Sequence, residues 1–113
     1  MIRNGLYLLD VEPLDGGVGG YRGVVVLRDG RLLGGGSFFY FVGNYSCSGG
    51  RWKGDLTQQE HTPVPYTVPT ARRVVTAGFT GTYTDEGAAY EATALVGKRS
   101  LRYRADMRLL AAD

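Results

Sequence analysis

The chain has 113 residues, with 13 Lys and Arg against 11 Asp and Glu and a formal net charge of +2. This length fits one domain, residues 1–113, around a single core, and the balanced charge gives no argument for a nucleic-acid partner. The single cysteine excludes an intrachain disulfide. Glycine is the unusual component: its 18 residues are more than twice the usual share of roughly 7%. With no fixed period, they indicate short strands joined by tight turns.

We expect no secretory leader at the start of the chain. Its apolar run, residues 6–9, ends at Asp10 and is shorter than the roughly 7–15 residues that a leader requires. No other run approaches the roughly 18 apolar residues of a membrane-spanning helix. We therefore expect a cytoplasmic protein without a membrane partner.

The first half of the chain alternates apolar and polar residues with a period of two, which is typical of β-strands. We expect five strands here, over residues 5–12, 21–28, 31–35, 38–46 and 51–61. Asp29-Gly30 is the strongest hairpin signal. Residues 13–20 are predicted to be a flexible glycine loop, and residues 47–50 a turn.

A triple glycine, Gly34–Gly36, precedes the aromatic run Phe38–Phe41. A dinucleotide fingerprint needs G-x-G-x-x-G opening a helix, and a Walker-type loop needs Gly-Lys-Ser/Thr. The sequence has neither, so a phosphate-binding loop is not expected. We interpret the glycines as a sheet corner that admits bulky neighbours, and we expect the aromatic run to fill the interior.

The second half continues the same pattern after a proline-rich segment. Three prolines make a central strand over residues 62–70 unlikely, because proline lacks the backbone donor; we interpret this segment as an irregular crossing loop. Three strands follow, over residues 72–83, 88–96 and 101–110, with Thr84–Gly87 as a turn between the first two. Eight strands in consecutive hairpins predict an all-β fold. An antiparallel up-and-down barrel removes exposed sheet edges, and a β-sandwich is the alternative.

We expect no catalytic or metal site, no cofactor, and therefore no enzyme. His61 is the only histidine, and no Ser or Cys is placed as its nucleophile. One histidine and one cysteine without motif spacing do not make a typical zinc site. We expect Cys47 to be exposed in its turn and to lack the neighbouring base that a reactive thiolate needs.

Basic residues crowd the end of the chain: Lys98, Arg99, Arg102, Arg104 and Arg108, relieved only by Asp106. Such a stripe could follow phosphates. More often it is the solvated face of a strand and discourages edge pairing. We favour the solvated face and expect no nucleic-acid partner.

The chain also contains eight tyrosines and one tryptophan. Eight strands enclose either a core filled by side chains or a cavity for one small ligand. Six aromatic residues are candidates for the inner lining: Tyr7, Tyr21, Trp52, Phe79, Tyr90 and Tyr103. A ligand would need an open cavity of roughly 300 Å³ or more.

An ordered set of motifs resembles the GrlR family of bacterial regulators. These motifs are the Asn4–Tyr7 start, the Val24–Leu33 hairpin, Gly35–Ser37, the Tyr40–Ser46 run and the Glu60–Pro65 strand end. The resemblance implies a small eight-stranded barrel of lipocalin-like shape that forms homodimers. It further implies a negative regulator that acts by binding a transcriptional regulator.

The resemblance also indicates a partner-binding turn between the fourth and fifth strands, which is acidic in the family. The matching residues are Cys47, Ser48, Gly49 and Gly50, followed by Arg51 and Lys53, and they include no acid. We therefore expect a non-enzymatic regulatory or interaction protein, with this turn as the candidate contact. The alternative is a lipocalin-like barrel that binds a small apolar ligand.

Overall fold

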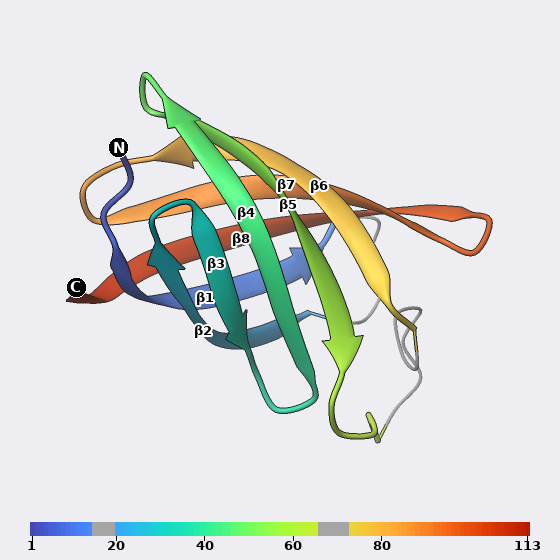
Figure 1. The fold of residues 1–113 in the computed structure, drawn as a ribbon. Helices are drawn as coiled ribbons and strands as arrows, with labels where there is room; N and C mark the ends of the chain where they lie inside the picture. Colours follow the sequence, from blue (N-terminus) through green and yellow to red (C-terminus); the bar gives the residue numbers. More distant parts are fainter. Residues whose placement is uncertain (15–19, 66–72) are drawn as a thin grey trace.

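The computed structural model describes residues 1–14, 20–65 and 73–113, and within them eight strands form one closed barrel (Figure 1). The strands are β1 (Gly5–Pro13), β2 (Tyr21–Arg28), β3 (Arg31–Gly35), β4 (Phe39–Ser48), β5 (Arg51–Glu60), β6 (Val75–Tyr83), β7 (Gly87–Val96) and β8 (Arg99–Ala112). Each strand pairs antiparallel with its neighbours in sequence. The predicted up-and-down barrel is confirmed.

Pairing between the first and last strands closes the barrel and distinguishes it from a sandwich. β1 pairs with β8 from Gly5↔Ala112 to Pro13↔Tyr103, with one irregularity between Leu6 and Tyr7. The eighth strand is longer than the predicted 101–110 because it continues along β1 at one end and along β7 at the other. No edge strand is left in the sheet, which removes the site where foreign strands would add.

Two hairpins turn on pairs of residues with positive φ. Asp29 and Gly30 have φ of 49° and 87°, and Gly49 and Gly50 have 59° and 81°. Positive φ at both central residues is what a type I′ turn requires. The Asp29-Gly30 prediction is confirmed. The predicted 47–50 turn is too wide: Gly49-Gly50 is sufficient, so Cys47 and Ser48 continue β4.

The predicted sheet corner does not include the whole triple glycine, because its first two residues still belong to a strand. Gly34 and Gly35 belong to β3, and the chain reverses only after them, where the Gly36 N–H donates to the Phe39 carbonyl at 2.9 Å. A Cβ on Gly34 would collide with the Val24 carbonyl oxygen and would lie 3.0 Å from the Phe41 ring. Glycine is used here because a neighbouring strand and an aromatic ring occupy the space of a side chain.

The interior is built from alternate residues of every strand, as a period of two requires. In the aromatic run, Phe39 and Phe41 face inward and are buried, whereas Tyr40 is exposed and Phe38 half-buried. The expectation that the whole run fills the barrel is therefore wrong, because successive strand residues point to opposite faces.

The remaining connections follow the prediction in part. Thr62–Pro65 lie outside any strand, and β6 begins at Val75, whereas residue 72, the first of the strand predicted over 72–83, lies outside the described residues. The predicted Thr84–Gly87 turn is present, and the Thr84 N–H donates to the Gly87 carbonyl at 2.9 Å. Residues 15–19 and 66–70 of the two predicted loops lie outside the described residues.

Candidate functional site

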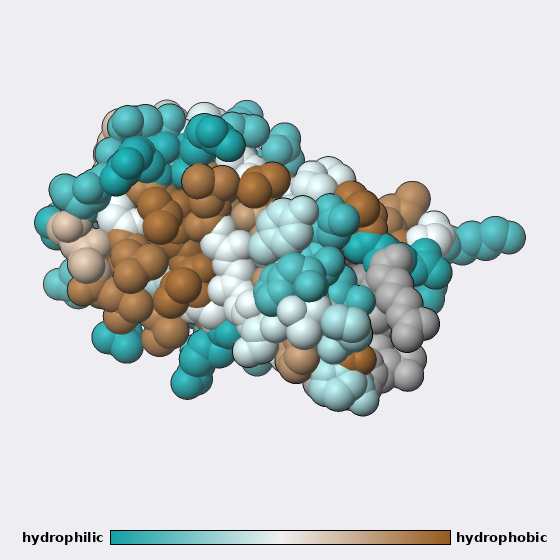
Figure 2. Space-filling view, turned by 60° about the horizontal axis from the view of Figure 1, so that its bottom comes forward, coloured by the Kyte–Doolittle hydropathy of each residue, from teal (hydrophilic) through white to brown (hydrophobic). Residues whose placement is uncertain are grey.

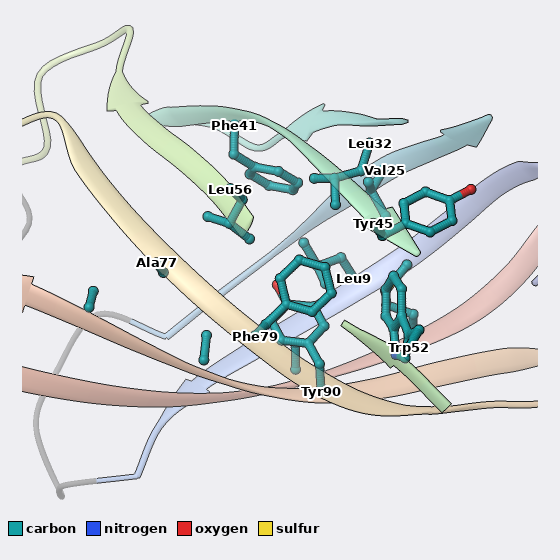
Figure 3. Packing of buried hydrophobic residues seen from close by; sticks show 14 of the residues in the cluster. Leu9, Val25, Leu32, Phe41, Tyr45, Trp52, Leu56, Ala77, Phe79 and Tyr90 are labelled. Carbon is teal, nitrogen blue, oxygen red and sulfur yellow. The ribbon is translucent and has the colours of Figure 1, made fainter. Parts of the chain in front are cut away.

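Aromatic rings pack together in one half of the barrel (Figure 3). The Trp52 ring lies 5.6 Å from Tyr45, 4.9 Å from Phe79 and 5.8 Å from Tyr90 between centroids, each close to edge-on. The Trp52 indole N–H donates to the Ala89 carbonyl at 3.1 Å. Such edge-to-face pairs stabilise beyond the area they bury, and this half of the barrel is a packed core.

All six candidate lining residues face the interior, but they divide into two groups. Tyr7, Trp52 and Phe79 belong to the packed core, and the Tyr7 hydroxyl donates to the Arg3 carbonyl at 2.6 Å. Tyr21 and Tyr103 line a small cavity toward the opposite end, and Tyr90, whose ring also contacts Trp52 and Phe79, belongs to both groups.

The cavity has a volume of about 50 Å³. Its wall combines alanines on β6 and β7 with aromatic and polar side chains: Val11, Tyr21, Phe39, Leu56, Gln58, Val75, Ala77, Tyr90, Ala92, Ala94 and Tyr103. The Tyr21 hydroxyl donates to the Gln58 side-chain oxygen at 3.1 Å. Small-molecule sites usually measure about 300–1,000 Å³, so this cavity accommodates only a few water-sized groups and is smaller than the ligand-binding alternative requires.

Burial is the main cause of the raised pKa values of the inner tyrosines. Removal from water raises the pKa of Tyr90, and burial together with the nearby Tyr90 and Tyr103 raises the pKa of Tyr21. Burial also raises the pKa of Tyr7 and of Tyr45. These phenols therefore stay protonated at neutral pH and are not poised for acid–base chemistry.

The β4–β5 turn presents little to a partner. Cys47 is half-buried and packs against the core, so the expectation of an exposed thiol is wrong. Gly49 and Gly50 have open space around them. Arg51 and Lys53 are exposed. The described geometry thus gives this turn two cations and no apolar anchor.

His61 links two segments rather than serving a reactive group. Its Nε2 lies 2.8 Å from the Gly36 carbonyl oxygen and its Nδ1 lies 2.7 Å from the Thr62 hydroxyl. Both ring nitrogens therefore have partners. Among residues 1–14, 20–65 and 73–113, no group of three or more His, Cys, Asp or Glu could hold a metal ion.

An apolar surface on the outside of β1–β4 and the end of β8 is the feature that the sequence interpretation missed. It appears in Figure 2 as the large hydrophobic area. We call it the apolar face; its members are Leu6, Leu8, Val24, Val26, Leu33, Tyr40, Val42 and Leu110. The signal was in the sequence, because β1 and β2 are apolar at outward as well as inward positions, a pattern typical of strands covered on both faces.

Strand register makes the apolar face continuous. Leu6 pairs with Val26, Val26 with Leu33, and Leu33 with Val42, so one row of aliphatic side chains crosses four strands. Leu8 pairs with Val24 in the next row. Six of its members are each about two-fifths exposed, together on the order of 400 Å² of apolar surface, a size that often marks an interaction site.

Charged groups of both signs border the apolar face. The Arg22 side chain contacts Asp10 at 2.8 Å, and Arg28 contacts the side chain of Asp113 at 2.6 Å. The Asn4 side-chain amide donates to Asp29 at 3.0 Å. This rim therefore carries charges of both signs, and polar groups commonly surround the apolar centre of a protein interface.

The other outer surface, over β4–β7, is polar. It holds a wide, shallow groove of about 680 Å³ with Lys53, Asp55 and Glu91 among its lining residues. The arginine stripe lies beyond this groove on β8 and is partly neutralised, since Arg102 contacts Glu91 at 3.7 Å and Arg104 contacts Asp106 at 3.6 Å. This arrangement agrees with a solvated strand face.

No protein-family model matches the chain, and no curated protein matches it in a sequence comparison. Membership of the GrlR family therefore stays a prediction that depends on the motifs. Within the described residues, no helix is long and apolar enough to cross a membrane.

Proposed function

We propose that the protein is a non-enzymatic interaction protein and that the apolar face is its contact surface. The single observation behind this proposal is the unbroken Leu6–Val26–Leu33–Val42 row on the outside of the barrel. A partner that covered these aliphatic side chains would stabilise the complex by about 25 cal/mol for each Å² of apolar surface removed from water. The β4–β5 turn has no comparable anchor, so we assign the contact to the apolar face.

A second copy of the chain is the first partner that we propose. The rim carries charges of both signs, with Arg22 beside Asp10 and Arg28 beside Asp113. A two-fold dimer places each surface against itself, so a rim of one sign would repel its copy, whereas a mixed rim complements it. Typical stable interfaces bury about 800 Å² on each partner, and the apolar face would supply the central half of that area.

Regulation by binding a transcriptional regulator is the role that the sequence resemblance adds to this proposal. In that scheme the second copy and the regulator would use different surfaces or compete for the apolar face. An internal cavity of about 50 Å³ does not support the ligand-binding alternative.

Size-exclusion chromatography with light scattering measures the molar mass of the protein in solution and so tests the homodimer, at protein concentrations of roughly 1–100 µM. We expect a dimer for the wild type and a monomer for Leu33→Glu, because the substitution places a charge at the centre of the row. Thr80→Glu is the matched control, since Thr80 is exposed on the polar outer surface. It should leave the dimer intact.

A wild-type monomer at every concentration would refute the homodimer. The wider proposal would then depend on capture of a defined protein from the native host that Leu33→Glu abolishes and Thr80→Glu preserves. If neither the dimer nor such a capture is found, the interaction function is wrong.

A further inference from the structure

The hairpin between β7 and β8 extends beyond the barrel wall (Figure 1). Pairing of β6 with β7 stops at Ala77↔Ala94, and pairing of β1 with β8 stops at Pro13↔Tyr103. The β7–β8 ladder nevertheless continues to Val96↔Arg99. The turn beyond it, Gly97-Lys98, has positive φ at Gly97, so residues 95–100 form a projecting tip.

Two aliphatic side chains lie exposed at this tip. Leu95 is 71% exposed and Val74 is 64% exposed, more than any member of the apolar face. Val74 directly precedes β6, and its neighbour Arg73 reaches the turn: the Arg73 Nη1 lies 3.3 Å from the position of a Cβ on Gly97. The segment before β6 and the hairpin tip therefore form one surface.

Three cations surround these aliphatic groups. Arg73, Lys98 and Arg99 are all exposed, and none of them forms an ion pair with another described residue. By contrast, Arg102, the next base along β8, contacts Glu91. The tip thus combines uncompensated positive charge with exposed apolar side chains.

We propose that this tip docks on an anionic phospholipid surface, with Leu95 and Val74 entering the interfacial region and Arg73, Lys98 and Arg99 contacting headgroups. Each cation near an anionic membrane contributes roughly 1 kcal/mol, and apolar side chains favour the acyl boundary. The docking is peripheral and needs no membrane-spanning segment, so it departs from the expectation of no membrane partner, which rested on the lack of an apolar span. It is independent of the apolar face, which lies on β1–β4 and at the far end of β8.

Two other occupants fit the tip less well. A nucleic acid would use the cations, but single strands also need aromatic side chains for stacking, and the exposed apolar groups here are aliphatic. A second copy of the same tip would bring three like charges against three. Charge and apolar character together therefore favour lipid.

Vesicle co-sedimentation of the full chain tests this docking. Vesicles of phosphatidylcholine with about 30% phosphatidylglycerol should bind half of the protein at lipid concentrations on the order of 0.1 mM, and pure phosphatidylcholine vesicles should bind much less. The double variant Lys98→Gln/Arg99→Gln should weaken binding to anionic vesicles about thirtyfold. Leu95→Ser/Val74→Ser should weaken it about tenfold at unchanged net charge.

Arg51→Gln/Lys53→Gln is the matched control, because it removes the same charge from the β4–β5 turn at the opposite end of the barrel. It should bind nearly as well as the wild type. Equal losses for both charge variants would overturn the proposal by showing that only net charge matters. Failure of Leu95→Ser/Val74→Ser to weaken binding would also overturn it, as would tighter binding of an oligonucleotide that displaces the protein from vesicles.

Discussion

The indole ring of Trp52 meets the ring of Phe79 nearly edge-on, with centroids 4.9 Å apart and planes inclined by 65°. This contact joins β5 to β6 inside the barrel, and Tyr45 and Tyr90 extend it to β4 and β7. One side chain thus holds four consecutive strands together, and the core of this half of the barrel depends on it.

Trp52→Ala should therefore be among the most damaging single substitutions in the chain. We expect the free energy of unfolding to fall by roughly 3–5 kcal/mol, because a large buried ring leaves a cavity that its neighbours fill only in part. Trp52→Phe keeps an aromatic ring but loses the N–H···O bond to Ala89, so it should cost about half as much. Urea denaturation followed by circular dichroism measures both; a loss below about 1 kcal/mol for Trp52→Ala would contradict this account.

Gly54 and Gly78 lie on paired strands and should respond oppositely to alanine. A Cβ on Gly54 would lie 2.8 Å from the Phe79 ring and closer still to the Asn44 carbonyl oxygen, whereas a Cβ on Gly78 would meet nothing within 4 Å. Gly54→Ala should cost roughly 1–3 kcal/mol through overpacking. Gly78→Ala should be neutral or stabilise by up to about 1 kcal/mol, because it reduces the entropy of the unfolded chain. Equal melting temperatures for the two variants would disprove the difference.

The order of the strands in the barrel could be predicted because each strand and each hairpin is specified by residues that are close together in the sequence. Alternation in residues 101–110 and the Asp29-Gly30 turn each specify one strand or hairpin without reference to distant residues. Closure by β1 and β8 followed from the need to cover edges. The exact turn at Gly49-Gly50 could not be read in this way, because the neighbouring Cys47 and Ser48 fit a strand or a turn equally well.

Features that depend on contacts between residues far apart in the sequence could not be predicted from short stretches of the chain. The place of Gly34 under the Phe41 ring and of Gly54 under Phe79 depends on which strands lie side by side. The same holds for the apolar face, whose members come from five strands. The sequence alone places Val24 and Val26 at outward positions of one strand. Only the strand register, which pairs Val26 with Leu33 and Leu33 with Val42, shows that these side chains belong to one surface.

Stability should fall steeply at alkaline pH because burial raises the pKa of inner tyrosines, above all Tyr90. In the unfolded chain a tyrosine loses its proton near pH 10, while in the barrel Tyr90 keeps its proton. Above about pH 10 the unfolded state therefore binds fewer protons than the folded state, so the free energy of unfolding decreases as pH rises. Below pH 10 both states are protonated, and this contribution is constant.

Urea denaturation at pH 8, 10 and 11 measures the effect. Each tyrosine of this kind removes roughly 1.4 kcal/mol for every pH unit above the unfolded value. The unfolded tyrosine is half ionised at pH 10, so Tyr90→Phe should lose about 1 kcal/mol less than the wild type between pH 10 and 11. Parallel pH dependence in the two proteins would show that Tyr90 ionises freely in the folded barrel, contrary to its burial.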